Sequence, residues 1–407
     1  MNQTATIDPT TSAPPVERVL DVDSHEMVPV ELREAIFGAT ELHAVGRKFK
    51  ISERSRPNKN SMPDLAGDVT PISYDSVWNM KGPYAPSAID LSRRPEVLDA
   101  MGIDRQLVFP TFGLMSLLML LDPNAHEFLG FDPTQVDRRK LGFEGVEAHN
   151  RWATQTTNST SARARPVGIV VTESLDVMMR QTERLLADGI RAVMIPANVA
   201  PLGASPAAPA LDPFWRLLAE ADVPVTIHLG TEFGFLASNR WATNVEAFHP
   251  SDKSTIEFTI EPHRAVTVHY SAENFLSAMV LGGVFERHPR LRFGAIEVSA
   301  NWLGPLADRL DMWVAREFKS RFTNLLSMRP SEYIARNVRV TPFPFEPIAD
   351  YLARYPELAS CYCYSTDYPH FEGGKESKRV FSEALRDASP HVRDQFFYQN
   401  GSWLLPE

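Results

Sequence analysis

Residues 190–230 read IRAVMIPANVAPLGASPAAPALDPFWRLLAEADVPVTIHLG, and the pattern within this stretch decides the fold. Two short apolar runs, Ile190–Ile195 and Pro224–Leu229, flank a segment whose apolar residues have helical spacing. Asp212 followed by Pro213 is typical of a helix start, an N-cap with proline at the first helical position. A strand, a helix and a strand in this order predict two parallel strands joined by a crossover helix.

The same alternation continues along the chain. Short β-branched or apolar runs bounded by turn residues predict eight strands: Arg18–Asp23, Gln106–Phe109, Pro166–Thr172, Ile190–Ile195, Pro224–Leu229, Leu291–Val298, Val338–Thr341 and Ser360–Thr366. Eight strands that alternate with helices predict an α/β fold, a (β/α)8 TIM barrel, with a doubly wound open sheet as the alternative. The sequence contains neither a GxGxxG nor a GxxxxGKS/T motif, so the usual nucleotide-binding reasons for an open sheet are missing.

Composition and charge limit the partners and the cellular location that we expect. Acidic residues outnumber basic ones by 51 to 41, and the net charge of −10 argues against nucleic-acid or anionic-membrane partners. No apolar stretch is long enough to span a membrane, and residues 1–17 lack the features of a signal peptide. Cys361 and Cys363 are too close in sequence for an ordinary structural disulfide. We therefore expect a cytoplasmic protein with a disordered tail, residues 1–17, and a single barrel domain, residues 18–407.

Two connections are too long for simple crossovers, about residues 27–104 and 231–257. Both are polar and contain prolines and aromatic residues such as Trp78 and Trp241. In a barrel they would be lids over the carboxyl-terminal face, where active sites lie. Because Trp241 and Phe248 need cover from a lid or a partner, we also expect a homodimer or a larger oligomer.

Polar residues follow three of the predicted strands. Asp23 and His25 end the first strand, and alternate residues of a strand share a face, so both can point at one metal ion. His228 closes the apolar strand Pro224–Leu229, and Asp367 follows the last strand. Each residue also has a structural explanation, a core imidazole for His228 and a helix cap for Asp367. Their shared position at the catalytic end of a barrel favours a functional site.

At these residues the sequence resembles the amidohydrolase superfamily, and in particular the branch that includes aminocarboxymuconate-semialdehyde decarboxylase and the resorcylate-type decarboxylases. Four further stretches support the resemblance: RPEVLDAMGIDRQLVFPT, GGVFERHPRLRFGAIEVSANWL, STDYPH and FYQNGSWLL. The resemblance implies that one divalent metal, Zn²⁺, Mn²⁺ or Fe²⁺, is bound by Asp23, His25, His228 and Asp367. It also makes Asp367 the best candidate for the acid/base.

The sequence departs from this family pattern at one position. Related decarboxylases have a histidine at the end of the sixth strand, where this chain has Glu297. A carboxylate there can act as a general base, bind an ammonium group, or bind a second metal ion together with His269. The alternatives are that Glu297 caps the helix that begins near Trp302 and that His269 only packs. His370 follows Asp367 closely enough to line the mouth of the barrel.

Three functions are consistent with these residues. The first is a metal-dependent hydrolase or non-oxidative decarboxylase that acts on a small carboxylated or cyclic substrate. The second is a dinuclear-iron monooxygenase built on the same barrel, favoured by Glu297 and by a second ion. The third is a mainly structural, metal-binding subunit of a hetero-oligomer. The number of metal ions per chain distinguishes the second function from the others. The two long connections determine which substrate is bound.

Overall fold

The computed structural model describes residues 18–29, 32–45, 70–126, 132, 134–232, 234–242, 245–248 and 262–407. The predicted tail, residues 1–17, and parts of both long connections lie outside these ranges. None of the helices in the described part of the chain is long and apolar enough to cross a membrane.

The strands are short, and every pair is parallel. In order around the fold they are β1 (Leu20–Asp21), β2 (Arg105–Val108), β3 (Ala164–Pro166), β4 (Gly168–Ile169), β5 (Val193–Met194), β6 (Val225–His228), β7 (Phe293–Ile296) and β8 (Val338–Val340). Only Val167 separates β3 from β4, and its N–H donates to Val108 O while the next N–H donates to Ala192 O. The two strands are therefore one strand position that joins the two sheets.

Residues 361–364 occupy the remaining strand position. Cys363 N donates to Val340 O at 3.0 Å, and Val22 N donates to Tyr364 O at 3.3 Å. These bonds connect β8 to β1 and complete the eight positions of a (β/α)8 barrel, as the sequence predicts. All eight predicted strands lie at or within a few residues of the observed ones.

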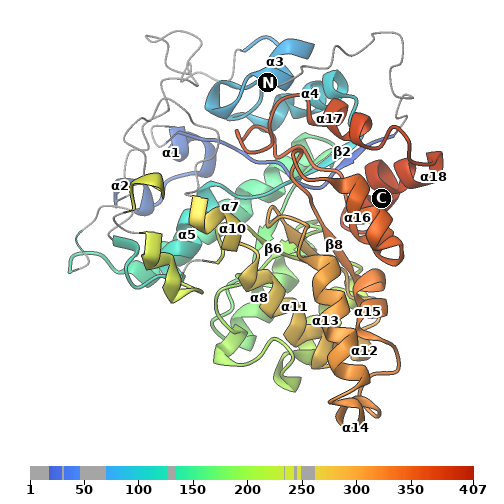
Figure 1. Ribbon diagram of the computed structural model, residues 1–407. Helices are drawn as coiled ribbons and strands as arrows, with labels where there is room; N and C mark the ends of the chain where they lie inside the picture. Colours follow the sequence, from blue (N-terminus) through green and yellow to red (C-terminus); the bar gives the residue numbers. More distant parts are fainter. Residues whose placement is uncertain are drawn as a thin grey trace.

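The helices lie around the barrel (Figure 1). Their bounds are α1 (Arg33–Phe37), α2 (Leu42–Val45), α3 (Tyr74–Asn79), α4 (Arg94–Met101), α5 (Phe112–Leu121), α7 (Arg138–Ser159), α8 (Leu175–Ala187), α9 (Asp212–Ala221), α10 (Pro262–Thr267), α11 (Tyr270–Leu281), α12 (Val284–Arg287), α13 (Leu303–Ala315), α14 (Lys319–Phe322), α15 (Pro330–Asn337), α16 (Ile348–Arg354), α17 (Ser377–Ala384), α18 (Pro390–Asp394) and α19 (Asn400–Ser402).

The start of helix α9 differs from the prediction that Asp212 is its N-cap. The helix begins at Asp212 itself, and the capping position, Leu211, makes no side-chain capping bond. The Asp212 carboxylate instead accepts hydrogen bonds from Arg287 at 3.0 Å and His288 at 3.1 Å. Since two cationic or imidazole donors are within reach, the carboxylate makes these contacts instead of the helix-capping bond that the sequence predicts.

Alternation along the strands divides the core into two layers. Leu20, Val22, Leu107 and Phe109 belong to a cluster in the barrel interior, whereas Val108 belongs to a larger cluster that includes buried side chains of the surrounding helices. Cys361 and Cys363 are both free and buried. The interior is therefore a packed core, and the polar groups described below lie at its carboxyl-terminal end.

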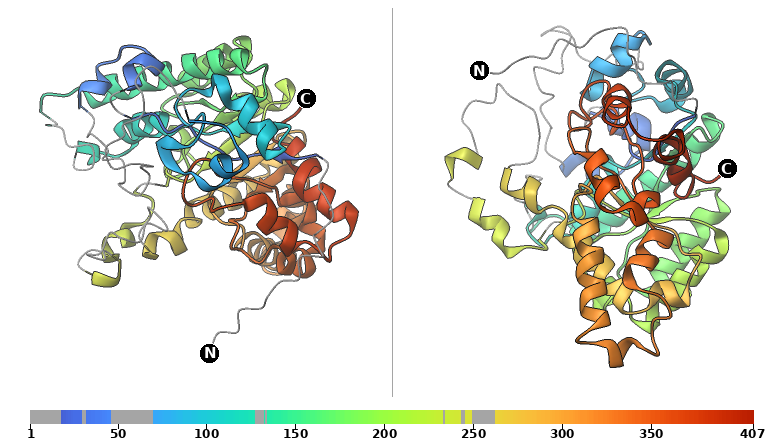
Figure 2. Two further views of the ribbon diagram at one scale, coloured as in Figure 1. Left: turned by 90° about the horizontal axis from the view of Figure 1, so that it is seen from above. Right: turned by 45° about the vertical axis from the view of Figure 1, so that its right-hand side comes forward.

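The first long connection packs against the carboxyl ends of the strands, and the second begins there. Met27 N donates to Ala88 O, and Gly82 N donates to Pro369 O, so residues 82–88 pack beside the ends of the first and last strands. Arg264 of α10 pairs with Glu232, which follows β6. Figure 2 shows the yellow segment around α10 projecting from the body of the barrel.

Candidate metal centre

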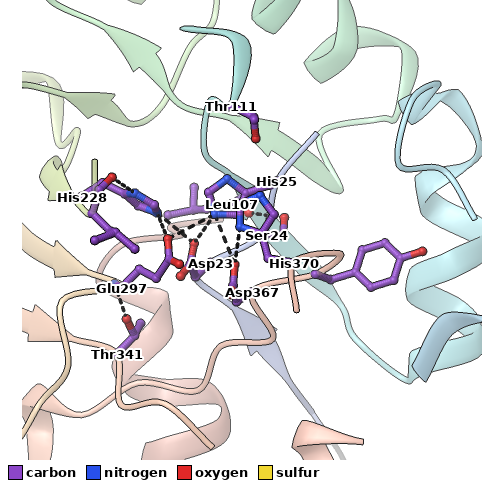
Figure 3. A network of polar contacts seen from close by, with 12 residues as sticks. Asp23, Ser24, His25, Leu107, Thr111, His228, Glu297, Thr341, Asp367 and His370 are labelled. Atoms are coloured by element: carbon purple, nitrogen blue, oxygen red, sulfur yellow. Dashed lines mark hydrogen bonds and ion pairs between the residues drawn. The ribbon is translucent and has the colours of Figure 1, made fainter. Parts of the chain in front are cut away.

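Six titratable side chains from four strand ends converge at the mouth of the barrel (Figure 3). They are Asp23 and His25 after β1, His228 at the end of β6, Glu297 directly after β7, and Asp367 and His370 after residues 361–364. All except His370, which is partly buried, are buried.

Local structure explains how the first strand presents its two residues. Ser24, between Asp23 and His25, points away and donates a hydrogen bond from its hydroxyl to Leu107 O at 2.6 Å. Phe109 N in turn donates to Ser24 O. Because Ser24 is anchored to β2 and its side chain points the other way, Asp23 and His25 face the site together.

A first group consists of Asp23, His25, His228 and Glu297, which each offer a ligand atom within 4.8 Å of the others. His228 Nε2 lies 3.3 Å from Asp23 Oδ1 and 3.3 Å from Glu297 Oε2. His25 Nε2 lies 3.5 Å from Asp23 Oδ1 and 3.6 Å from Glu297 Oε2. Two imidazoles and two carboxylates at these separations could surround one cation.

A second group overlaps the first and consists of His25, Glu297, Asp367 and His370. Asp367 Oδ1 lies 3.4 Å from His25 Nε2 and 3.0 Å from His370 Nδ1. The His370 ring stacks on the His25 ring with centroids 3.8 Å apart. His25 and Glu297 therefore lie between the two groups.

The hydrogen bonding of the two histidines tests whether the site fits a metal ion. His228 Nδ1 lies 2.8 Å from Leu229 O and must donate to it, so the neutral ring presents a lone pair at Nε2. Neither ring nitrogen of buried His25 has a hydrogen-bond partner among the described residues. Lone pairs that face carboxylate oxygens in a buried site need a cation or protons between them. The residues present therefore fit a divalent metal ion.

Burial and neighbouring charges shift the pKa values of the site residues. Burial, together with the carboxylates of Asp367 and Asp23, raises the pKa of Glu297 well above its ordinary value. Burial also raises the pKa of Asp367 and lowers that of His25. Burial alone would lower the pKa of His370, but the adjacent Asp367 carboxylate raises it to about 9. A divalent cation would favour the charged carboxylates that burial now disfavours.

Two of these residues have an unusual backbone. Glu297 has a φ of 57° and Asp367 a φ of 49°, in the left-handed region that costs non-glycine residues of the order of 1–3 kcal/mol. Hydrogen bonds hold both: Glu297 N donates to Thr341 Oγ1 at 2.9 Å, and Asp367 N donates to Asp23 O at 2.9 Å. Such strain is typical of functional sites.

The structure brings together most of the residues singled out in the sequence. Asp23, His25 and His228 share the first group with Glu297, and Asp367 lies in the second group. His269 is in neither group found among the described residues; its ring packs against Tyr270 and Trp302. The Glu297 carboxylate lies against His25 and His228, and among the described residues no hydrogen bond joins it to the start of α13.

Two buried residues beside the site were not foreseen. Glu26 accepts hydrogen bonds from Thr111 N and Phe112 N at the start of α5, and it immediately follows the Asp-x-His pattern. Burial lowers the pKa of Lys81 to about 8 against the opposing effect of Asp367 and Glu372. Lys81 lies within a long connection, and no motif marks it in the sequence.

Comparisons with known proteins agree with this architecture. The family model described as Amidohydrolase matches residues 119–402. An amidohydrolase from Mycobacterium avium subsp. paratuberculosis K-10 is similar in structure, with a TM-score of 0.63 and 20% identity over 96% of this chain and 100% of that chain. A search of curated proteins found no match.

Two decarboxylase structures are also similar. One is 5-carboxyvanillate decarboxylase from Novosphingobium aromaticivorans with bound manganese and 3-methoxy-4-hydroxy-5-nitrobenzoic acid (TM-score 0.57, 17% identity, 96% of this chain and 97% of that chain). The other is dihydroxybenzoic acid decarboxylase from Polaromonas sp. JS666 with manganese and 2-nitroresorcinol (TM-score 0.55, 13% identity, 96% and 97%). At these identities the similarity establishes the fold.

Proposed function

The chain belongs to the amidohydrolase family, and from this premise we propose that it is a metal-dependent hydrolase or non-oxidative decarboxylase for a small carboxylated or cyclic substrate. The observation that carries the proposal is the contact between His228 Nε2 and two carboxylate oxygens, each 3.3 Å away. Because His228 Nδ1 is committed to Leu229 O, this arrangement is stable only with a cation or protons at its centre.

We assign the binding of one divalent ion to Asp23, His25, His228 and Glu297. Two carboxylates and two imidazoles suit Zn²⁺, Mn²⁺ or Fe²⁺, and the manganese in two similar decarboxylases favours Mn²⁺. When bound, the ion would polarise a carboxyl or carbonyl group of the substrate or lower the pKa of a bound water.

Asp367 and His370 are the acid–base pair in this proposal. His370 carries a proton at neutral pH because its pKa is about 9, and its Nδ1 lies 3.0 Å from Asp367 Oδ1. Asp367, 3.4 Å from His25 Nε2, is then placed to give a proton to the reacting carbon or leaving group and to take it back.

Metal content and turnover of two variants test the proposal. Glu297→Gln should lower Mn²⁺ affinity at least about 10-fold, because an amide is a poorer ligand than a carboxylate. Asp367→Asn should retain Mn²⁺ but lose turnover of substrates drawn from aromatic and cyclic carboxylates or their lactones and amides. Wild-type protein that binds neither Mn²⁺ nor Zn²⁺ would contradict the proposal. Metal-loaded protein without activity would favour the structural-subunit alternative.

The overlap of the two groups favours a second candidate, the dinuclear-iron monooxygenase. His25 and Glu297 are common to both groups, so Asp23 and His228 with these two residues would hold one ion, and Asp367 and His370 with the same two would hold a second. In this arrangement His370, and not His269, supplies the imidazole for the second ion. The test is to load the protein with iron in the absence of oxygen and to measure the metal content. Two irons per chain would support the monooxygenase, whereas one ion per chain would exclude it.

We further propose that the protein is cytoplasmic and forms a homodimer or a larger oligomer, with a hetero-oligomer as the alternative. Trp241 is 74% exposed and Phe345 is 69% exposed, and contact with a partner would remove this apolar surface from water. Light scattering at micromolar concentration tests this proposal, and a single monomeric mass would contradict it.

A further inference from the structure

Asp21 lies beneath the mouth, and none of the roles described above uses it. Its carboxylate is completely buried and accepts four hydrogen bonds. Asp21 lies opposite Gln106 in the β1–β2 register, with Leu20 and Val22 packed in the barrel interior on either side of it. The register shifts by one residue before His25, which lies opposite Phe109, so Asp21 does not share the face of Asp23 and His25 despite the even spacing. It therefore cannot contact the metal or the substrate directly, and any effect on the site must act through its partners.

The first partners of Asp21 belong to the last strand position. Thr366 N donates to Asp21 Oδ1 at 2.8 Å, and the Thr366 hydroxyl donates to Asp21 Oδ2 at 2.5 Å. The same hydroxyl accepts a hydrogen bond from Tyr368 N at 3.0 Å. Asp367, between these residues, is the one with the left-handed backbone, and its own N–H donates to Asp23 O. Asp21 thus stabilises both flanks of the strained residue.

The remaining partners connect Asp21 to the first strand. Asp23 N donates to Asp21 Oδ1 at 3.2 Å, and Gln106 Nε2 donates to Oδ2 at 2.5 Å. Gln106 Oε1 accepts a hydrogen bond from Arg94 Nη1 at 2.8 Å, and Arg94 Nη2 donates to His25 O at 3.0 Å. Arg94 and Gln106 are also fully buried. One network therefore fixes the backbone of Asp23, His25 and Asp367.

From this geometry we infer that Asp21 is a positioning residue for the metal centre, acting through Thr366 on one side and through Gln106 and Arg94 on the other. The inference rests on the proposed function. A buried carboxylate and a guanidinium separated by an amide contribute less to stability than apolar side chains of similar volume. The function of Asp21, Gln106 and Arg94 here is to hold in one arrangement the two strand ends that carry Asp23, His25 and Asp367.

The pattern of donors and acceptors provides a sharp test. In Asp21→Asn, the new amide faces the Gln106 amide donor, and a flip of Gln106 only moves the mismatch to Arg94. In the double variant Asp21→Asn/Gln106→Glu, the carboxylate introduced at position 106 accepts both from the amide introduced at position 21 and from Arg94. The double variant exchanges the two groups and keeps the charge of the network.

The measurement is calorimetric titration of metal-free protein with Mn²⁺, together with thermal unfolding. We expect Asp21→Asn to weaken Mn²⁺ binding about 10- to 100-fold, and the double variant to recover affinity close to the wild-type value. Asn400→Ala is the matched control, because buried Asn400 donates to Tyr362 O at the other end of the same strand position. The control should unfold at lower temperature but bind Mn²⁺ normally.

Several outcomes would overturn the inference. Wild-type Mn²⁺ affinity in Asp21→Asn would do so, and so would a double variant as weak as the single one. If Asp21→Asn does not fold, Thr366→Val removes one hydroxyl of the network, and unchanged Mn²⁺ affinity in that variant would overturn the inference. Wild-type protein that binds no metal would overturn the proposed metal centre and this inference with it.

Discussion

Buried asparagines at the amino ends of the strands and the site residues at the carboxyl ends differ in how their polar atoms find partners. At the amino ends of the strands, Asn337 donates to Leu291 O and Pro289 O, and Asn400 donates to Tyr362 O and Ala359 O. In both cases a neutral amide donates to neutral carbonyls, and the protein itself completes these hydrogen bonds. At the carboxyl ends, carboxylate oxygens face imidazole lone pairs. These two asparagines are satisfied without a ligand, whereas the group at the carboxyl ends needs a cation or protons.

The largest effect should come from removing a ligand at the carboxyl end. His228→Ala should reduce Mn²⁺ affinity by more than about 100-fold. The loss of a direct ligand should exceed the loss of about 10- to 100-fold that is expected for a residue that only positions a ligand. The midpoint of thermal unfolding without metal should stay the same or rise, because the imidazole is crowded by carboxylates. Calorimetric titration and a melting curve measure both quantities. Loss of soluble protein would instead indicate that His228 is a core residue, and the comparison of the two ends would fail.

A second test uses a buried imidazole outside the mouth. His149 of α7 lies 2.9 Å from Val167 O, and burial lowers its pKa to about 4. Since the unfolded chain titrates near pH 6.5, it binds more protons than the native state between pH 6.5 and 4, and stability falls as the pH falls. The loss should approach roughly 3 kcal/mol.

Chemical denaturation at pH 7 and pH 4.5 measures this loss, and His149→Gln is the variant to compare. Glutamine can still donate to Val167 O but does not titrate, so the variant should lose less stability than the wild type over the same interval. An equal loss in both proteins would assign the pH dependence to other groups.

A smaller effect is expected at the amino end. Asn337→Ala leaves the carbonyls of Leu291 and Pro289 without their donor, so the free energy of unfolding should fall by about 1–3 kcal/mol. Mn²⁺ affinity should not change. Denaturant titration and calorimetry together measure the difference, and a parallel loss of Mn²⁺ affinity would show that the two ends are coupled.

Much of the fold could be predicted because a parallel strand buried on both sides has a distinctive sequence. The run VPVTIHLG is apolar, β-branched and ends in a turn residue, and it becomes β6 with His228 as its last residue. The same reasoning located Asp23, His25 and Asp367, because the carboxyl ends of parallel strands meet at one edge.

The arrangement within the site could not be predicted in this way. Whether Glu297 or Asp367 approaches His228 depends on their positive φ values, and no sequence signal indicates left-handed backbone at an acidic residue. His370 was placed only at the mouth, because its stacking on His25 depends on the tight turn after Asp367. His269 has the right chemistry for a ligand, but its ring packs against aromatic neighbours.

The pairing of the first strand with the last has a consequence for biosynthesis. Asp21 and Thr366 are 345 residues apart, yet their hydrogen bonds support Asp23 and Asp367 alike. A nascent chain on the ribosome has already made His25 and His228 long before residues 361–367 emerge to close the ring. The complete centre therefore forms only after residues 361–367 have been made and have docked beside β1. A divalent ion that needs ligands from all four strand ends would then be bound only after this docking, and not while the earlier strands fold.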